Sequence, residues 1–304
     1  MNTHSFTRRE MLYSVAALGA TGAGLTSSAL AAAGKLQSST TASAARIRLG
    51  AQTNAWPIDP SRFDSFLSAL RDVRATGYSG FETGFANFRS QSKSLPEARG
   101  QIESAGLTFI GVHIYLPEYD PVTNIAPQPL LEAVAQTGAA LGAQRLILSG
   151  SPAINQDEIR LKADALIRAG EFAGKLGLKV AYHNHWPEFK YNGREIEALY
   201  AATDPALVWF LLDAGHAYRT GIDLPAFVRR HSQRLTAIHF RDYRDQLQVP
   251  LGQGTLPLAE IAAALKQENW TGWAMNEEER EDGSKQGLGV IGPAFRALEG
   301  AFPA

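Results

Sequence analysis

Two histidines, His183 and His185, end an apolar run that begins at Lys179. On a β-strand, residues at positions i and i+2 lie on the same face, so both imidazoles would project from one strand end. Such a pair can ligate a metal ion or act as an acid/base pair. This spacing is the first indication of a reactive site in the chain.

Other apolar segments also end in polar residues, and these are Gln52, Glu82, His113, Asp213, His239 and Glu277. In a parallel barrel the carboxyl ends of all strands meet at one face, where active sites are built. Convergence there would give a mixed nitrogen and oxygen ligand set for a divalent ion. The alternative is a polar layer at the barrel mouth whose members only satisfy one another.

The apolar segments alternate with longer amphipathic segments, which predicts strands and helices of one α/β domain. The predicted strands are Arg48–Thr53, Gly80–Thr83, Thr108–His113, Arg145–Gly150, Lys179–His185, Val208–Asp213, Leu235–Phe240 and Trp273–Glu277. The predicted helices are Ser61–Thr76, Pro129–Leu141, Asp157–Leu176, Leu224–His231, Leu258–Glu268 and Gly292–Leu298. This order predicts a single-domain (β/α)8 TIM barrel, since the first strand lacks the glycine-rich turn of a doubly wound sheet.

The N-terminal residues differ in composition from the rest. Arg8 and Arg9 precede an apolar stretch rich in small residues, and Ala29-Leu30-Ala31 offers a cleavage site. The arrangement resembles a twin-arginine export signal over residues 1–33, followed by a flexible leader over 34–46 and the barrel over 47–304. The alternative is an N-terminal helix or uncleaved anchor. We expect a periplasmic or secreted protein without stable membrane insertion after cleavage.

Charge and cysteine content narrow the classes of ligand. The chain has 29 basic and 30 acidic residues, so no electrostatic footprint for nucleic acid or an anionic membrane stands out. It contains no cysteine, so there is no disulfide framework. Any metal ion must be held by His, Asp, Glu or Asn side chains, which suit Mn, Co, Fe, Zn or Mg.

Two of the strand ends have informative neighbours. Asp213 is followed by Ala214, Gly215 and His216, so Asp213 and His216 could both reach the cavity. Asp242 comes three residues after His239. We expect its carboxylate to orient a metal-binding histidine, or to balance its charge, without contacting the ion itself.

These residues together resemble the xylose isomerase-like TIM barrels, the sugar phosphate isomerase/epimerase superfamily, over residues 47–300. The resemblance implies one divalent metal ion with one ligand from each of strands five to eight, usually Glu, Asp, His and Glu. It assigns the last three ligands to Asp213, His239 and Glu277. Manganese is the first choice of ion, with Co, Zn, Mg and Fe as alternatives.

His183 stands where the superfamily usually has a glutamate, and we expect it to be the fourth ligand. In the 3-epimerases of the superfamily the strand-five and strand-eight glutamates also form the acid/base pair. Of these two glutamates, this sequence has only Glu277, which disfavours the two-glutamate mechanism of a simple epimerase. The sequence Tyr-His-Asn-His at residues 182–185 resembles the branch of inosose dehydratase-like and 3-keto-sugar-processing proteins.

The candidates for acid/base chemistry are His185, Glu277, Glu82 and His216. His185 could instead bond to neighbouring loops. Glu82 resembles the strand-two acid that binds substrate in many relatives, and a structural salt bridge is its alternative. For His216 the alternative is a helix cap. The candidates for substrate binding are His113, Gln52, Trp186 and Arg241, although His113 could equally cap the third strand.

Several other features are weaker signals. The segment Leu251–Thr255 contains a G-x-G that could hold an anion, but an ordinary loop is preferred. The acidic run after Glu277, up to Asp282, is expected to be a solvated loop. His231, at a helix end, is expected to be surface structure. Aromatic residues after strands could form a wall for a sugar, and these are Trp56, Phe85, Phe88, Tyr115 and Trp186.

The function that these features favour is a divalent-metal-dependent sugar isomerase, epimerase, lyase or dehydratase. It would abstract an α-proton from a keto-sugar or polyol derivative, such as a 3-keto-glycoside or an inosose. The alternative is an exported, non-catalytic sugar-binding barrel. An endonuclease IV-like nuclease is a remote alternative, since those relatives carry more metal ligands and the near-neutral charge offers nothing to DNA.

Overall fold

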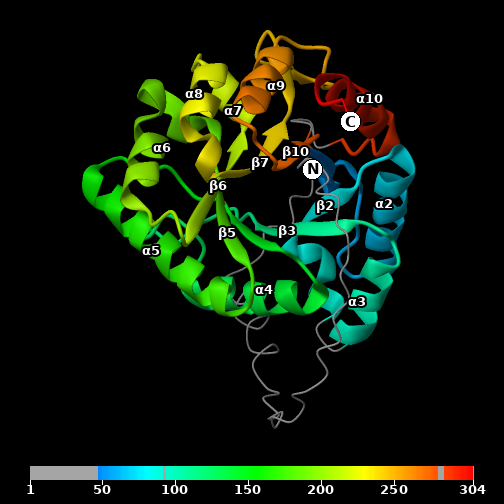
Figure 1. Cartoon of the computed structure of the whole chain (residues 1–304). Helices are drawn as coiled ribbons and strands as arrows, with labels where there is room; N and C mark the ends of the chain where they lie inside the picture. Colours follow the sequence, from blue (N-terminus) through cyan, green and yellow to red (C-terminus); the bar gives the residue numbers. More distant parts are fainter. Residues whose placement is uncertain (1–46, 92–93, 280–283, 304) are drawn as a thin grey trace, which may run out of the picture.

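Eight parallel strands close into one barrel, and the helices form a ring around it (Figure 1). The computed structural model describes residues 47–91, 94–279 and 284–303. Neighbouring strands follow the order β1-β10-β7-β6-β5-β4-β3-β2. The strands are β1 (Arg48–Gln52), β2 (Gly80–Gly84), β3 (Thr108–Ile114), β4 (Arg145–Leu148), β5 (Lys179–His183), β6 (Val208–Asp213), β7 (Leu235–Phe240) and β10 (Trp273–Asn276). The TIM barrel and all eight predicted strands are confirmed, whereas the predicted export signal and leader lie outside the described residues.

Nine α-helices occur in the described parts of the chain. They are α2 (Phe63–Thr76), α3 (Leu95–Glu103), α4 (Gln128–Leu141), α5 (Gln156–Lys175), α6 (Lys190–Ala202), α7 (Ala214–Tyr218), α8 (Leu224–His231), α9 (Leu258–Gln267) and α10 (Leu288–Ala301). The six predicted helices are present, with α10 longer than expected. Short 3-10 turns η1 (Thr53–Ala55), η2 (Phe85–Gln91), η3 (Trp186–Phe189) and η4 (Ser232–Arg234) complete the loops. None of the described helices is long and apolar enough to cross a membrane.

Large side chains fill the barrel interior because glycines on adjacent strands leave room for them. A Cβ on Gly80 would come within 2.8 Å of the Trp273 ring, and one on Gly50 within 2.5 Å of Met275 Sδ. Trp273 and Met275 are fully buried in this inner cluster, together with Ile110, Ile147, Ala181, Leu211 and Ala237. The apolar cluster forms a floor on which polar side chains at the carboxyl ends of the strands can rest.

A hairpin of β8 (Asp242–Arg244) and β9 (Leu247–Val249) follows β7 and was not predicted. The Asp242 carboxylate accepts hydrogen bonds from the backbone N–H groups of Gly252, Gly254 and Leu256 at 2.8–3.0 Å. The predicted role of Asp242 behind a histidine is therefore wrong. The G-x-G segment does surround an anion, but that anion is a carboxylate of the same chain, so the segment is a structural loop.

Candidate metal centre and active site

Four strands bring the candidate ligands to one end of the barrel interior. On β5, β6, β7 and β10 a buried apolar residue contributes to the barrel floor, and the residue two positions later points the same way. The pairs are Ala181 with His183, Leu211 with Asp213, Ala237 with His239, and Met275 with Glu277. The alternation that buries the floor thus fixes the direction of all four polar side chains.

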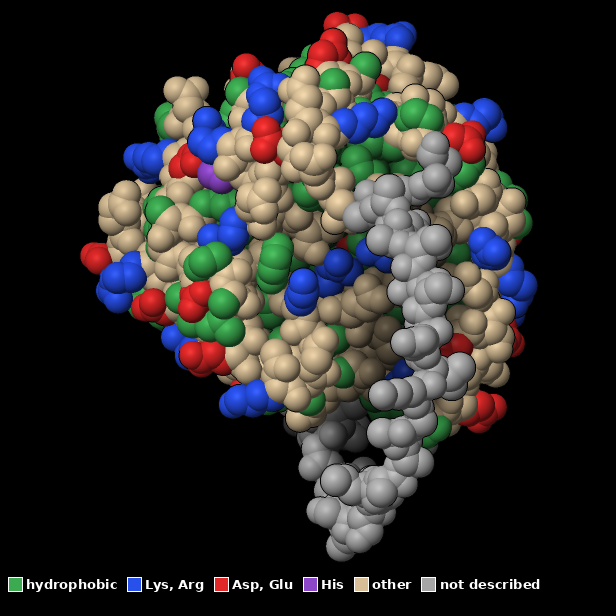
Figure 2. Space-filling model, viewed as in Figure 1, with side chains coloured by type: hydrophobic (Ala, Val, Ile, Leu, Met, Phe, Trp, Pro, Cys, Tyr) green, Lys and Arg blue, Asp and Glu red, His purple; other side chains and the backbone are tan. Residues whose placement is uncertain are grey.

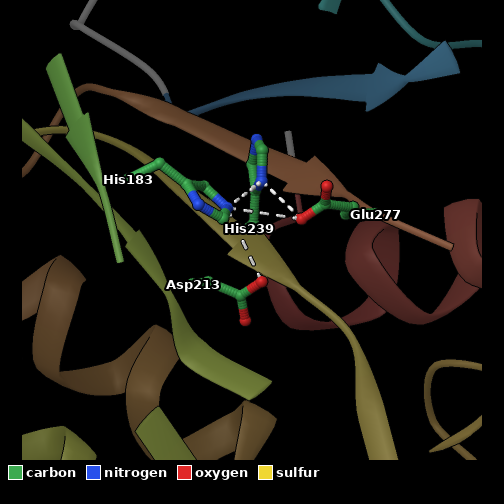
Figure 3. Close-up of side chains that lie close together, drawn as sticks. All are labelled: His183, Asp213, His239 and Glu277. Atoms are coloured by element: carbon green, nitrogen blue, oxygen red, sulfur yellow. Dashed lines mark hydrogen bonds and ion pairs between the residues drawn. The ribbon is translucent and has the colours of Figure 1, made fainter. Parts of the chain in front are cut away.

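The side chains of His183, Asp213, His239 and Glu277 point toward one another (Figure 3). Each offers one ligand atom, and these atoms all lie within 4.8 Å of one another. His183 Nε2 lies 3.7 Å from Asp213 Oδ2 and 3.5 Å from Glu277 Oε2. His239 Nδ1 lies 2.7 Å from Glu277 Oε2. These are the four residues that the sequence predicts as metal ligands, and all four are buried.

Glu82 lies behind His239. Its Oε2 is 2.7 Å from His239 Nε2, and its side chain is completely buried and lies outside the cavity lining. The sequence suggested Glu82 for acid/base chemistry on substrate, whereas its position suits a residue that orients His239. Glu82 thus occupies the place that the sequence analysis gave to Asp242. Burial alone would lower the pKa of His239, but the carboxylates of Glu277 and Glu82 outweigh burial and raise it to about 10.

Arg241 lies against both carboxylates of the cluster. Its Nε is 2.8 Å from Asp213 Oδ2, and its Nη2 is 2.5 Å from Glu277 Oε2. Burial raises the pKa of Asp213 to about 7, with Arg241 opposing that rise. Burial would also raise the pKa of Glu277, but Arg241 and His239 hold it well below its usual value. The sequence suggested Arg241 for substrate binding, and nothing in the sequence indicated its contact with the two predicted ligands.

The donor set fits a divalent metal ion. Two imidazoles and two carboxylates form a mixed set suited to Mn, Zn or a similar ion. Asp213 Oδ2 is buried and, within the described residues, accepts no hydrogen bond, although Arg241 Nε is close. Glu82 holds one ring nitrogen of His239 and leaves the other facing the cluster, an arrangement common behind metal-bound histidines.

Three further histidine rings surround the cluster. His185 lies beside His183, with ring centroids 5.3 Å apart, and His216 lies 5.2 Å from His185. His113 Nε2 lies 2.8 Å from Ser149 Oγ, which in turn is 3.4 Å from His183 Nδ1. Burial lowers the pKa of His185 to about 4 and that of His113 to about 3. Both rings are therefore neutral near pH 7, and a neutral imidazole can accept a proton.

A cavity of about 860 Å³ opens above the cluster. Its lining includes His183 and Glu277 and all the predicted substrate-binding residues, Gln52, His113, Trp186 and Arg241. His185 and His216 line it too, as do Trp56, Phe85 and Tyr115 of the predicted aromatic wall, whereas Phe88 is buried in the core. Basic side chains gather near the middle of the face seen in Figure 2, beside a hollow.

The structure shows where several other residues named in the sequence analysis lie. His216 is both a cavity residue and part of a helix start, since its backbone N–H donates to Asp213 Oδ1 at 2.8 Å. His231 pairs with Glu197 away from the cavity, as expected of a structural residue. Glu278, predicted to be solvated, is 2% exposed, and its Oε1 accepts a hydrogen bond from Leu251 N. Glu281 and Asp282 lie outside the described residues.

A buried charged network, which was not predicted from the sequence, holds the segment that carries His185. Lys162 Nζ lies 2.7 Å from Glu195 Oε1, 3.4 Å from Glu188 Oε1 and 2.9 Å from the carbonyl oxygen of Ser151. Glu188 Oε2 accepts a hydrogen bond from His185 N at 2.5 Å. A lysine on the buried stripe of α5, three residues after Ile159, is the signal that could have indicated such a network.

Comparisons with known proteins agree with this fold. A family model described as xylose isomerase-like TIM barrel matches residues 70–294. An inosose dehydratase from Bacillus licheniformis is 28% identical over 248 residues, which cover 70% of this chain and 80% of that protein. The solved structure of IolI with a zinc atom has a TM-score of 0.68 and 14% identity, covering 84% of this chain and 98% of its own. The solved structure of 3-keto-D-glucoside 4-epimerase from E. coli has a TM-score of 0.64 and 16% identity. The match covers 84% of this chain and 100% of the epimerase chain.

Proposed function

Because this chain belongs to the xylose isomerase-like TIM barrel family, we propose that it is a metal-dependent sugar-processing enzyme that acts by removing an α-proton from a keto-sugar. One observation carries the proposal: four buried ligand atoms converge within 4.8 Å at a cavity that His185 and His216 also line. A sugar-binding module would have no need of such a buried set. The names of proteins similar to this chain, which include a dehydratase and an epimerase, support the same class of reaction.

His183, Asp213, His239 and Glu277 would hold the ion. A bound divalent ion polarises a carbonyl and makes the neighbouring C–H more acidic. Burial keeps the four side chains away from bulk water, where charge interactions are weaker.

Proton transfer falls to residues around the cluster. His185 is neutral near pH 7 and lines the cavity next to His183, so it can accept a proton from substrate carbon. His216 lines the cavity with its ring 5.2 Å from that of His185, so it can contact a substrate hydroxyl. The guanidinium of Arg241 can stabilise negative charge that develops on a substrate oxygen.

The substrate and the ion remain open to direct test. We propose an inosose-like or 3-keto-glycoside substrate and manganese as the first ion. A screen would offer free ketoses, inososes and 3-keto-glycosides in deuterated water to protein loaded with each candidate ion, with mass as the readout. A gain of one mass unit without loss of atoms indicates exchange of the α-proton, the step that isomerisation and epimerisation share, and loss of water or of the attached group indicates elimination. If none of these compounds gains deuterium or loses atoms with any ion, the proposal is wrong.

We propose in addition that the enzyme works outside the cytoplasm. The support is Arg8 and Arg9 before a small-residue-rich apolar stretch and the Ala29-Leu30-Ala31 sequence. Replacing both arginines by lysine should retain the protein in the cytoplasm, as measured by cell fractionation. Unchanged export of that variant would contradict the proposed location.

A further inference from the structure

The cavity is larger than one reacting sugar ring needs. Its volume is about 860 Å³. Pockets that enclose drug-sized ligands measure about 300–1,000 Å³, so this cavity lies near the upper end of that range. A substrate that fills it would carry a second group of similar size next to the reacting ring.

The two sides of the cavity differ in chemistry. The segments after β1 to β5 contribute the aromatic residues Trp56, Phe85, Tyr115 and Trp186 to the lining, among polar and small side chains. The opposite side carries mostly charged and polar residues, with one aromatic residue, Tyr243, beside His216, Arg219, Arg241 and Glu277. Polar groups suit the hydroxyls and carbonyl of the reacting sugar. Flat aromatic faces suit an apolar-faced group, either an aryl ring or the apolar face of a second sugar.

Tyr115 and Trp186 are unusual because they are exposed as well as aromatic. Tyr115 is 61% exposed and Trp186 is 39% exposed, although both line the cavity. The ammonium of Lys190 lies 4.4 Å from the centre of the Trp186 ring, a contact that helps to fix the indole. Residues that served only to pack the fold would be buried, so these two rings are available to a ligand.

A line of ring contacts connects the candidate metal centre with Tyr115. The centroids of His239 and His183 lie 4.9 Å apart, those of His183 and His185 5.3 Å apart, and those of His185 and Tyr115 5.8 Å apart. His185 therefore lies between the ligand cluster and Tyr115. A sugar that reacts at the cluster would lie beside His185, and a group attached to that sugar would reach Tyr115.

We infer that Tyr115 and Trp186 form a subsite for the group attached to the reacting sugar, so that the enzyme prefers keto-glycosides to free keto-monosaccharides. This inference rests on the proposed function, because it takes the cluster as the place of reaction. The subsite would take a flat substituent with an apolar face. Either an aryl ring or a second sugar could be that substituent.

Binding of three 3-keto-glucosides to the manganese-loaded full chain tests the inference. The methyl glycoside supplies the reacting ring alone, the phenyl glycoside adds an aryl ring, and 3-keto-cellobiose adds a sugar. We expect the phenyl compound, the disaccharide or both to bind about tenfold more tightly than the methyl compound, as aromatic contacts permit. The compound that gains affinity identifies the source.

Substitutions at the two rings test whether the gain in affinity arises from this subsite. Tyr115→Ala or Trp186→Ala should remove most of the gain, measured in each protein as the ratio of the affinities for the larger and the methyl compound, and Trp186→Phe should keep part of it. The matched control is Tyr191→Ala, since Tyr191 is 80% exposed but is not in the cavity lining. A gain that is absent, that survives both alanine substitutions, or that Tyr191→Ala removes equally would overturn the inference.

Deuterium exchange into the methyl compound separates this inference from the proposed function. Exchange without any affinity gain for the larger compounds would leave the proposed function standing and reject the subsite. An affinity gain without exchange in any compound would reject the proposed function and leave the subsite as a binding feature.

Discussion

Glu82 Oε2 lies 2.7 Å from His239 Nε2, on the side of the ring that faces away from the other three candidate ligands. This contact fixes the orientation of the imidazole and directs Nδ1 toward Glu277 Oε2, also at 2.7 Å. A carboxylate behind a metal-bound histidine makes the ring a better ligand. Glu82 is thus a positioning residue of the centre.

Glu82→Gln should weaken manganese binding about 10–100-fold, because the amide still fills the space but no longer supplies a negative charge to His239. Isothermal titration calorimetry of the metal-free protein measures the effect. Glu260→Gln, at an exposed glutamate on α9, is the matched control. Equal affinity for the Glu82 and Glu260 variants would show that Glu82 does not support the centre.

Arg241→Met should act in opposite directions on metal-free stability and on metal affinity. The metal-free variant should lose about 3–5 kcal/mol of unfolding free energy, because two buried carboxylates lose their cation. The same loss should tighten manganese binding about tenfold or more, since the ion no longer competes with a guanidinium 2.8 Å from Asp213 and 2.5 Å from Glu277.

Arg219→Met is the control for that measurement, since Arg219 lines the cavity and its guanidinium lies over the Tyr243 ring. Thermal melts with and without manganese give both quantities. Weaker metal binding by the Arg241 variant than by the wild type would contradict the competition.

Lys162→Met should destabilise the protein by about 3–5 kcal/mol, because the substitution leaves buried carboxylates without their cation. These are Glu188 at 3.4 Å and Glu195 at 2.7 Å from Nζ. Urea unfolding measures the loss. Lys175→Met, at an exposed position near the end of the same helix, should change stability by less than about 0.5 kcal/mol. Similar small effects of both substitutions would rule out a stabilising network.

His185 should make the metal-free protein sensitive to acid. Its pKa falls from 6.5 to about 4 on folding, because burial disfavours the charged ring. The unfolded chain therefore binds the proton more readily, and stability falls as the pH drops below 6.5 toward 4. The expected loss from His185 at pH 5 is about 2 kcal/mol.

Unfolding free energies of wild type and His185→Asn between pH 7 and pH 5 isolate this contribution. Asp213, whose pKa rises to about 7, changes stability in the opposite direction but is present in both proteins and cancels in the comparison. The variant should lose less stability than the wild type on acidification. Parallel pH profiles would show that His185 is not held neutral by burial.

The barrel and the inward direction of the four candidate ligands could be predicted because a simple periodicity determines both, whereas the family resemblance singled these four out among the strand-end residues. Alternation along each strand directs His183, Asp213, His239 and Glu277 inward once the residue two positions earlier belongs to the barrel floor. Helix α6 was harder to predict, because Tyr191, Asn192 and Gly193 at its beginning adopt positive φ angles. A local sequence pattern does not reveal such a start.

The supporting contacts could not be predicted, because each joins residues far apart in the chain. Glu82 and His239 are 157 positions apart, and Lys162 and Glu195 are 33 apart. Asp242 shows the same limit, since its proximity to His239 in the sequence suggested a contact that the turn into β8 does not make. Spacing predicts which way a side chain points, whereas its partner depends on the packing of the whole barrel.

The central claim is that the four-residue centre holds an ion needed to remove an α-proton from a keto-sugar. The most direct measurement follows deuterium incorporation at the α-carbon of methyl 3-keto-glucoside or an inosose by nuclear magnetic resonance. The metal-loaded wild-type protein should catalyse exchange, and removal of the metal by a chelator should abolish it. Added manganese should restore exchange in the wild-type protein but not in the Asp213→Ala variant. Exchange that persists at full rate after chelation, or in metal-free Asp213→Ala, would contradict the account.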